Sequence, residues 1–203
     1  EEQDDNDELY ATTLYSYDVR DNLVQVTDSD NNTTTMSYDW LSRKTSMTDP
    51  DMGSWGYGYD SRGNLTTQTD AKDQTITFTY DSLCRLTGKS YPAGANMTAV
   101  VYSYDNITDG KGLRTGMTDA IGTTTYKYDN RGQLIEETLQ VPGVDSYTTG
   151  YGYDRTGRLT NIIYPTGENV TQGFNGRGLP DSLSGTTAGD IVTGTLYNSL
   201  GQV

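Results

Sequence analysis

A Tyr-Asp pair returns every 21 to 25 residues along almost the whole chain, and this repeat constrains the fold more than any other feature. Seven copies are intact and the last two read Phe-Asn and Tyr-Asn; the nine copies begin at Tyr17, Tyr38, Tyr59, Tyr80, Tyr104, Tyr128, Tyr153, Phe174 and Tyr197. A repeat this short is one supersecondary unit copied side by side, and it cannot bury an apolar face alone. We therefore expect the function to come from the array.

Each repeat has the pattern of a strand, a turn and a return strand. Residues 75–80 alternate threonine with Ile, Phe and Tyr, and this period of two predicts a half-buried strand. Asp60-Ser-Arg-Gly63 then has the composition of a type I turn whose glycine accepts positive φ. Leu65 to Thr69 forms the predicted return strand, and a second turn that begins at Asp70 closes the unit.

No window of the sequence has a sustained helical period, so we predict an all-β fold of tandem antiparallel β-hairpin repeats. Nine copies supply roughly 16 to 18 strands, or a strip about 80 Å wide at about 4.8 Å per strand. Open sheets of this size twist and curl. We therefore expect a long, twisted, curved strip with a packed Tyr/Leu face and a Thr/Asn/Ser face in water.

Two parts of the chain are expected. Six of the first eight residues are acidic, and residues 1–11 are predicted to be a disordered or linking leader. Residues 12–203 are predicted to form one continuous array of nine repeats. The chain begins and ends within the pattern, which suggests that it is a piece of a longer protein.

Composition removes several classes of function. The chain has no His and one Cys, which excludes the usual Cys/His zinc sites and the Ser-His-Asp and Cys-His nucleophiles. A net charge of −14 argues against a nucleic-acid partner, which needs a basic face. No run of about 18 apolar residues exists, so we expect no membrane span and no membrane partner in this segment.

The pattern Tyr-x-Tyr-Asp-x-x-Gly-x-Leu resembles the YD-repeat, or Rhs (rearrangement-hotspot), family over residues 12–203. It is clearest at Tyr57–Leu65, Tyr126–Leu134 and Tyr151–Leu159. The resemblance implies a β-strip that spirals into a hollow shell. In bacterial toxin systems such a shell encloses a C-terminal toxic domain; similar repeats occur in teneurin adhesion receptors and in wall-associated proteins.

The same resemblance implies a secreted or cell-surface location. The partners that it implies are the rest of a longer chain, an enclosed toxin domain, and a glycan or another protein. Some positions depart from the family pattern. Lys44 and Pro180 replace the leucine, and Gln172 and Thr195 replace the first aromatic. The family's plug and its variable toxin tail are not visible.

Single residues offer few candidates for chemistry. Cys84 occupies a turn-glycine position, where tolerated drift is favoured over a reactive thiol. The turns at Asp28-Ser-Asp30 and Asp49-Pro-Asp51 offer oxygen ligands for calcium, but Asp is also a common turn residue. Equivalent aspartates recur in all seven intact copies, and none stands out as a catalytic carboxylate. We therefore expect no catalytic, cofactor-binding or metal-binding residue and no cofactor.

Two further features concern glycans. Sequons lie in or beside predicted turns at Asn31, Asn32, Asn64, Asn96, Asn106 and Asn169. Tyrosine ladders can stack on sugars, although paired aromatics across strands usually stabilise a sheet. The leading hypothesis is a non-enzymatic structural segment of an Rhs/YD-repeat shell. The alternatives are an extracellular adhesion or carbohydrate-binding module, and a self-assembling fibre subunit joined through open sheet edges.

Overall fold

The computed structural model of the protein describes residues 2–3, 9–95 and 97–203. The described part contains strands and turns and no helix, as the sequence predicted. The chain divides into two compact units, Glu1–Ala99 (unit 1) and Val100–Val203 (unit 2).

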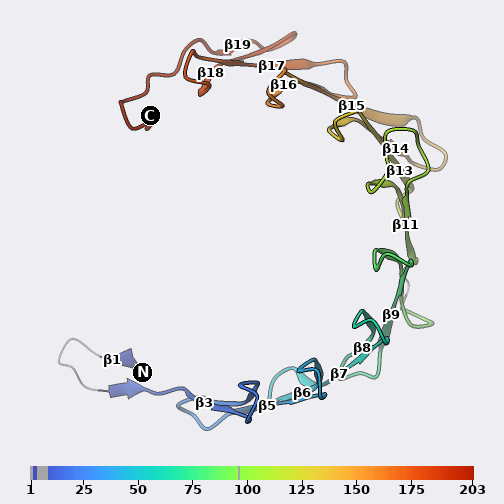
Figure 1. Cartoon of the computed structure of the whole chain (residues 1–203), viewed down its shortest axis with the longest axis vertical. Helices are drawn as coiled ribbons and strands as arrows, with labels where there is room; N and C mark the ends of the chain where they lie inside the picture. The colour runs from blue at the N-terminus through green and yellow to red at the C-terminus, as the bar shows by residue number, and fades with distance from the viewer. Residues whose placement is uncertain (1, 4–8, 96) are drawn as a thin grey trace. The chain divides into compact units, whose positions relative to one another are not determined.

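Unit 1 is an antiparallel meander in which each strand pairs with the next along the chain (Figure 1). Its strands are β3 (Leu14–Tyr17), β4 (Leu23–Thr27), β5 (Thr33–Tyr38), β6 (Lys44–Asp49), β7 (Gly53–Tyr59), β8 (Leu65–Thr69), β9 (Thr75–Tyr80) and β10 (Leu86–Ser90). Both β8 and β9 have the bounds that the sequence predicted.

The acidic leader is described only in part. The short strands β1 (Glu2–Gln3) and β2 (Leu9–Ala11) pair with each other. Residue 1 and residues 4–8 lie outside the described residues. The prediction that residues 1–11 are a disordered or linking leader therefore stays a prediction.

Unit 2 repeats the same meander. Its strands are β11 (Val100–Tyr104), β12 (Arg114–Thr118), β13 (Thr123–Tyr128), β14 (Leu134–Gln140), β15 (Ser146–Tyr153), β16 (Leu159–Ile163), β17 (Asn169–Phe174), β18 (Pro180–Gly185) and β19 (Gly189–Val192). In the described part of the chain, β3 to β19 make 17 antiparallel strands, within the predicted range.

The two faces of the sheet differ as the alternation predicts. In β9 the side chains of Ile76, Phe78 and Tyr80 are half-buried, while Thr77 and Thr79 are exposed. The Tyr face is nevertheless only half covered. Among the described residues, Tyr126 is the one buried large apolar side chain.

The missing core has a simple cause. Within each unit, every described strand contacts only its neighbours in the sheet, so no second layer covers the Tyr face. The sequence predicted a packed Tyr/Leu face because alternation identifies an apolar face, but alternation says nothing about what lies on it. A one-layer wall therefore depends on hydrogen bonds at its turns more than a two-layer domain does.

Candidate functional site

The Asp of each Tyr-Asp pair organises the turn that follows it, which we call the Tyr-Asp turn. In the third repeat, the Asp60 carbonyl accepts a hydrogen bond from the Gly63 N–H at 3.1 Å. Asp60 Oδ1 accepts the N–H groups of Arg62 and Asn64, both at 2.9 Å. Asp60 Oδ2 accepts Asn64 Nδ2–H at 2.9 Å. One carboxylate thus satisfies two backbone donors and one side-chain donor.

The same geometry recurs along the array. Oδ1 accepts the N–H groups two and four residues later at Asp18, Asp39, Asp81, Asp129 and Asp154, and at the substituted Asn175 and Asn198. The Asn64 side-chain hydrogen bond and the turn N–H groups hold the pKa of Asp60 below its usual value, because they stabilise the anion. Since an amide oxygen accepts the same two bonds, Asn preserves the turn without the charge.

The fourth turn position has positive φ, as predicted. Gly63, Gly132 and Gly157 have φ of 89°, 77° and 90°. Ser42 and Cys84 hold the same position with φ of 60° and 61°, in the left-handed region that favours glycine. Cys84 is exposed and free, at the turn position where the sequence placed it.

The Tyr of each pair joins consecutive repeats. The Tyr59 hydroxyl donates to the Lys44 carbonyl at 2.9 Å, and the Tyr80 hydroxyl donates to the Leu65 carbonyl at 2.9 Å. In both cases the acceptor begins the return strand of the preceding repeat. The same bond occurs at Tyr38, Tyr128, Tyr153 and Tyr197.

The register explains why this hydroxyl is needed. Strand β9 extends to Tyr80, but its pairing with β8 runs only from Thr69↔Thr75 to Thr67↔Thr77. The Leu65 carbonyl lies beyond that ladder, and the hydroxyl supplies the missing donor. Partial burial raises the pKa of the Tyr59 and Tyr80 phenols above its usual value, so both hydroxyls keep their proton at neutral pH.

Basic side chains add a second link between neighbouring turns. Arg20 Nη1–H donates to the Trp40 carbonyl at 2.6 Å, and Arg62 Nη1–H donates to the Ser82 carbonyl at 2.9 Å. Arg43 bridges Asp39 at 2.6 Å and lies 4.6 Å from the centroid of the Tyr59 ring. The sequence did not predict these links, although the recurrence of Arg two or four residues after the Asp was a visible signal.

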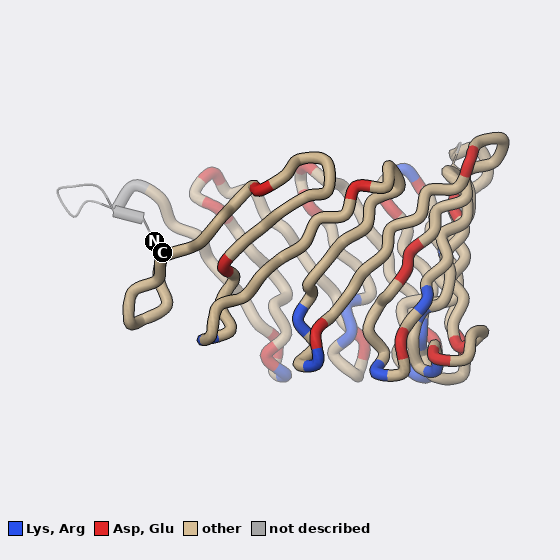
Figure 2. The backbone as a smooth tube through the Cα atoms, turned by 90° about the horizontal axis from the view of Figure 1, so that it is seen from above, with Lys and Arg blue, Asp and Glu red and all other residues tan. Residues whose placement is uncertain are grey.

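The opposite turns use their aspartates in the same way. Asp28 Oδ1 accepts the N–H groups of Asp30 and Asn32, and Asp49 Oδ1 accepts those of Asp51 and Met52. Among the residues described, no group of three or more His, Cys, Asp or Glu side chains is placed to hold a metal ion. Figure 2 shows that charged residues lie mostly at the turns, where these carboxylates serve the backbone.

The predicted sequons differ in accessibility. The side-chain amides of Asn32 and Asn64 donate to Asp28 and Asp60, so these two asparagines are engaged in their turns. Asn31 and Asn106 are exposed. Asn96 lies outside the described residues.

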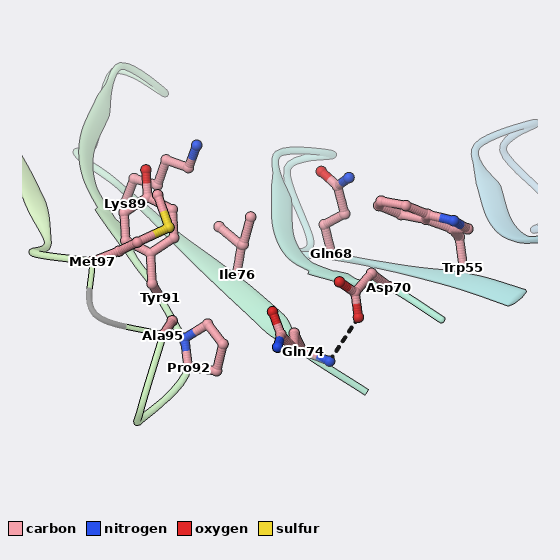
Figure 3. Close-up of a pocket in the computed structure, with 10 residues that line it drawn as sticks. All are labelled: Trp55, Gln68, Asp70, Gln74, Ile76, Lys89, Tyr91, Pro92, Ala95 and Met97. Atoms are coloured by element: carbon pink, nitrogen blue, oxygen red, sulfur yellow. Dashed lines mark hydrogen bonds between the residues drawn. The ribbon is translucent and has the colours of Figure 1, made fainter. Parts of the chain in front are cut away.

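Unit 1 also contains a cleft of about 260 Å³ on its Tyr face (Figure 3). Trp55 stands at one side and Tyr91 and Met97 stand at the other, with Ile76 between them. The polar lining residues are Gln68, Asp70, Gln74 and Lys89. Asp70 Oδ1 accepts the Gln74 N–H at 2.9 Å, and the Lys89 ammonium lies 4.9 Å from the centroid of the Tyr91 ring.

The comparisons with known proteins agree with this architecture. A family model described as RHS Repeat matches residues 17–51, 59–95 and 109–139, just over half of the chain. The chain belongs to the RHS-repeat family. No curated protein matches it significantly. Among the described residues, no helix is long and apolar enough to cross a membrane.

Solved toxin-complex structures have the same fold. The TcdB2-TccC3-Cdc42 structure matches 94% of this chain with a TM-score of 0.79 and 17% identity. A Tc holotoxin pore of Photorhabdus luminescens matches 94% with a TM-score of 0.77 and 18% identity. At this identity the likeness shows the fold alone. The RHS-repeat chain spans 11% of each of those chains.

Proposed function

We propose that this RHS-repeat segment is part of the wall of a shell that encloses a C-terminal, toxin-like domain of its own longer chain. The observation that supports this proposal most is the fold match to TcdB2-TccC3, which extends over 94% of the segment. One structure of that complex is described as lacking a hypervariable C-terminal region. The proposed location is extracellular or at the cell surface.

The half-covered Tyr face suits a wall. Half-buried aromatic side chains along β5, β7, β9 and β13 leave apolar surface that an enclosed polypeptide would contact. We propose that residues 12–203 act as one array and that residues 1–11 are a leader. Deletion of residues 1–8 is then expected to leave the thermal midpoint of the array unchanged.

Protease protection in the longer protein tests the enclosure. The C-terminal domain is expected to resist a protease while the repeats are folded, and to be degraded once acid or denaturant opens the array. The same domain expressed alone is the control and should be cleaved at once. Equal cleavage rates inside and outside the longer protein would contradict the proposal.

The proposed role is structural and not catalytic. The repeated aspartates are engaged by turn N–H groups, as Asp60 is. Hydrogen bonds to the anion lower the pKa values of Asp18, Asp39, Asp60, Asp81 and Asp154, which makes these carboxyl groups poor general acids. Purified protein is expected to hydrolyse no peptide, ester or glycan. Robust turnover that disappears on one Asp substitution would contradict this.

A carbohydrate-binding role is the second candidate, and the cleft in unit 1 favours it. Trp55 and Tyr91 offer aromatic faces, while Gln68, Gln74 and Asp70 offer hydrogen-bonding groups beside them. Titration calorimetry with soluble oligosaccharides tests this role. Binding should be lost in Trp55→Ala and kept in Trp40→Ala, which lies outside the cleft; no binding by the unmodified chain would remove this candidate.

A further inference from the structure

Four large apolar side chains protrude from Tyr-Asp turns of unit 1. Val19 is fully exposed, and Trp40, Leu41 and Leu83 are 75%, 50% and 68% exposed. They occupy the two tip positions of the turns that connect β3 to β4, β5 to β6 and β9 to β10. Turn tips are usually polar, so a row of exposed apolar tips calls for a partner.

These tips lie along one edge of the unit, because in an antiparallel meander every second turn falls on the same edge. The Arg20–Trp40 bond joins the first two turns directly, and the Arg62–Ser82 bond joins the next pair. Consecutive turns are two strands apart, or roughly 10 Å. We call Val19, Trp40, Leu41 and Leu83 the apolar edge.

The edge is local to unit 1. Unit 2 has an expanded first turn over residues 105–113. The tips of its four later turns are Asn130-Arg131, Arg155-Thr156, Gly176-Arg177 and Ser199-Leu200, and Leu200 is the one exposed large apolar residue among them. The repeat itself therefore does not require apolar tips.

The backbone of the apolar edge is largely satisfied from within. The Arg20 and Leu41 N–H groups donate to Asp18 Oδ1 and Asp39 Oδ1. The Ser42 N–H donates to the Asp39 carbonyl, and the Trp40 carbonyl accepts from Arg20. Backbone groups that enter an apolar phase must be paired in this way. These turns can therefore leave water with little loss of hydrogen bonding.

The charges around the edge are balanced. Asp39 and Asp81 are bridged by Arg43 and Arg85 at 2.6 and 2.7 Å. Arg62 is exposed beside the tips, where its guanidinium can reach the phosphate of a lipid headgroup. The exposed Trp40 ring suits the level just below the lipid phosphates, since indole rings favour the interface between headgroups and acyl chains.

From this combination we infer that the apolar edge of unit 1 docks on a zwitterionic lipid surface. The tips insert beside the headgroups while the sheet remains outside. A second copy fits this edge poorly, because each copy has a net charge of −14 and copies repel one another. A rigid partner would also leave gaps between the tips, because the Val19 and Trp40 turns are roughly 10 Å apart and the Leu41 and Leu83 turns, with the polar Ser61-Arg62 turn between them, are roughly 20 Å apart; mobile acyl chains fill such gaps. The expectation of no membrane partner rested on the absence of a long apolar run in the sequence. The apolar edge needs no such run, because the fold brings residues from separate turns to one edge of the sheet.

Vesicle flotation of the whole chain with phosphatidylcholine vesicles tests the inference. The chain is expected to float with the vesicles, and the double variant Trp40→Ser/Leu41→Ser to lose at least about tenfold in partitioning. Leu83→Ser should lose less. Met52→Ser is the matched control, because Met52 is 55% exposed at a turn on the opposite edge, and it should partition like the unmodified chain.

Fluorescence locates the contact. Trp55→Phe leaves Trp40 as the one tryptophan, and phosphatidylcholine with brominated acyl chains should quench it. Circular dichroism melts should show that all variants remain folded. The inference is overturned if the unmodified chain stays unbound at millimolar lipid, or if Met52→Ser weakens binding as much as the double variant. It is also overturned if sedimentation shows a dimer that the double variant abolishes while no vesicle binding occurs.

Discussion

Removal of one hydroxyl tests whether the Tyr of each pair joins the repeats. In Tyr59→Phe the Lys44 carbonyl loses the donor that lies 2.9 Å away, while the ring and its contact with Arg43 remain. A hydrogen bond of this kind contributes about 1 kcal/mol to the free energy of unfolding. Because the site is half-buried, water can partly replace the donor, and we expect a loss of about 0.5–1 kcal/mol.

Tyr57→Phe is the matched control. Tyr57 lies on the same strand and the same face, is also half-buried, and makes no hydrogen bond through its hydroxyl in the described part of the chain. We expect its free energy of unfolding to stay within about 0.3 kcal/mol of the unmodified value, since it loses no bonded partner.

Urea unfolding followed by tryptophan fluorescence measures both variants. Trp55 lies on β7 beside these residues and reports on this part of unit 1. For a chain of this size a loss of 1 kcal/mol lowers the thermal midpoint by roughly 2–4 °C. Adding Tyr38→Phe and Tyr80→Phe should extend the loss to about 1.5–3 kcal/mol, because the three sites are far enough apart for their effects to be nearly additive. The reasoning is refuted if Tyr57→Phe destabilises as much as Tyr59→Phe.

Four other expectations concern the turns and the titratable side chains. Asp60→Ala should lower the thermal midpoint, whereas Asp60→Asn should nearly preserve it, since Asn175 accepts the same turn bonds; equal losses would show that charge and not geometry matters. Gly157→Val should lower the free energy of unfolding by about 1–3 kcal/mol, because φ at residue 157 is 90°. Cys84→Gly should raise it in the same denaturation assay, because glycine favours the positive φ of residue 84. A Gly157→Val variant as stable as the unmodified chain would contradict the turn geometry. Melts across pH should show stability lost below about pH 4, because Asp39, Asp60 and Asp81 have lowered pKa values in the folded chain and the unfolded chain takes up protons first. Stability should also fall above about pH 10, because burial raises the pKa values of Tyr59, Tyr80 and Tyr153 in the folded chain and the unfolded tyrosines therefore ionise first. A flat profile at the acid end would contradict the turn hydrogen bonds, and a flat profile at the alkaline end would contradict the burial of these phenols.

Much of the fold could be predicted because the same strand and turn patterns recur in each repeat. The alternation in residues 75–80 and the glycine at position 63 each define a single local geometry, and both strand bounds and turn were confirmed. The single layer could not be predicted, because an alternating apolar pattern shows that one face of a strand is apolar but does not show whether another layer packs on that face. The Tyr80–Leu65 bond was also missed, since it depends on where the β8–β9 ladder ends.

The surfaces were harder to predict than the repeat. The cleft between Trp55 and Tyr91 is built from residues 36 positions apart whose proximity follows only from the strand register. The apolar edge has the same origin. In the sequence Val19, Trp40 and Leu83 are isolated apolar residues within separate turns. They form one surface only because the antiparallel meander places these turns on the same edge.

A cryo-electron microscopy reconstruction of the longer protein tests the central claim most directly. The account predicts that residues 12–203 appear as consecutive hairpins in the wall of a shell, with the Tyr face turned toward density of an enclosed domain. A reconstruction in which the Tyr face lies against solvent and the C-terminal domain stands outside the repeats would contradict it.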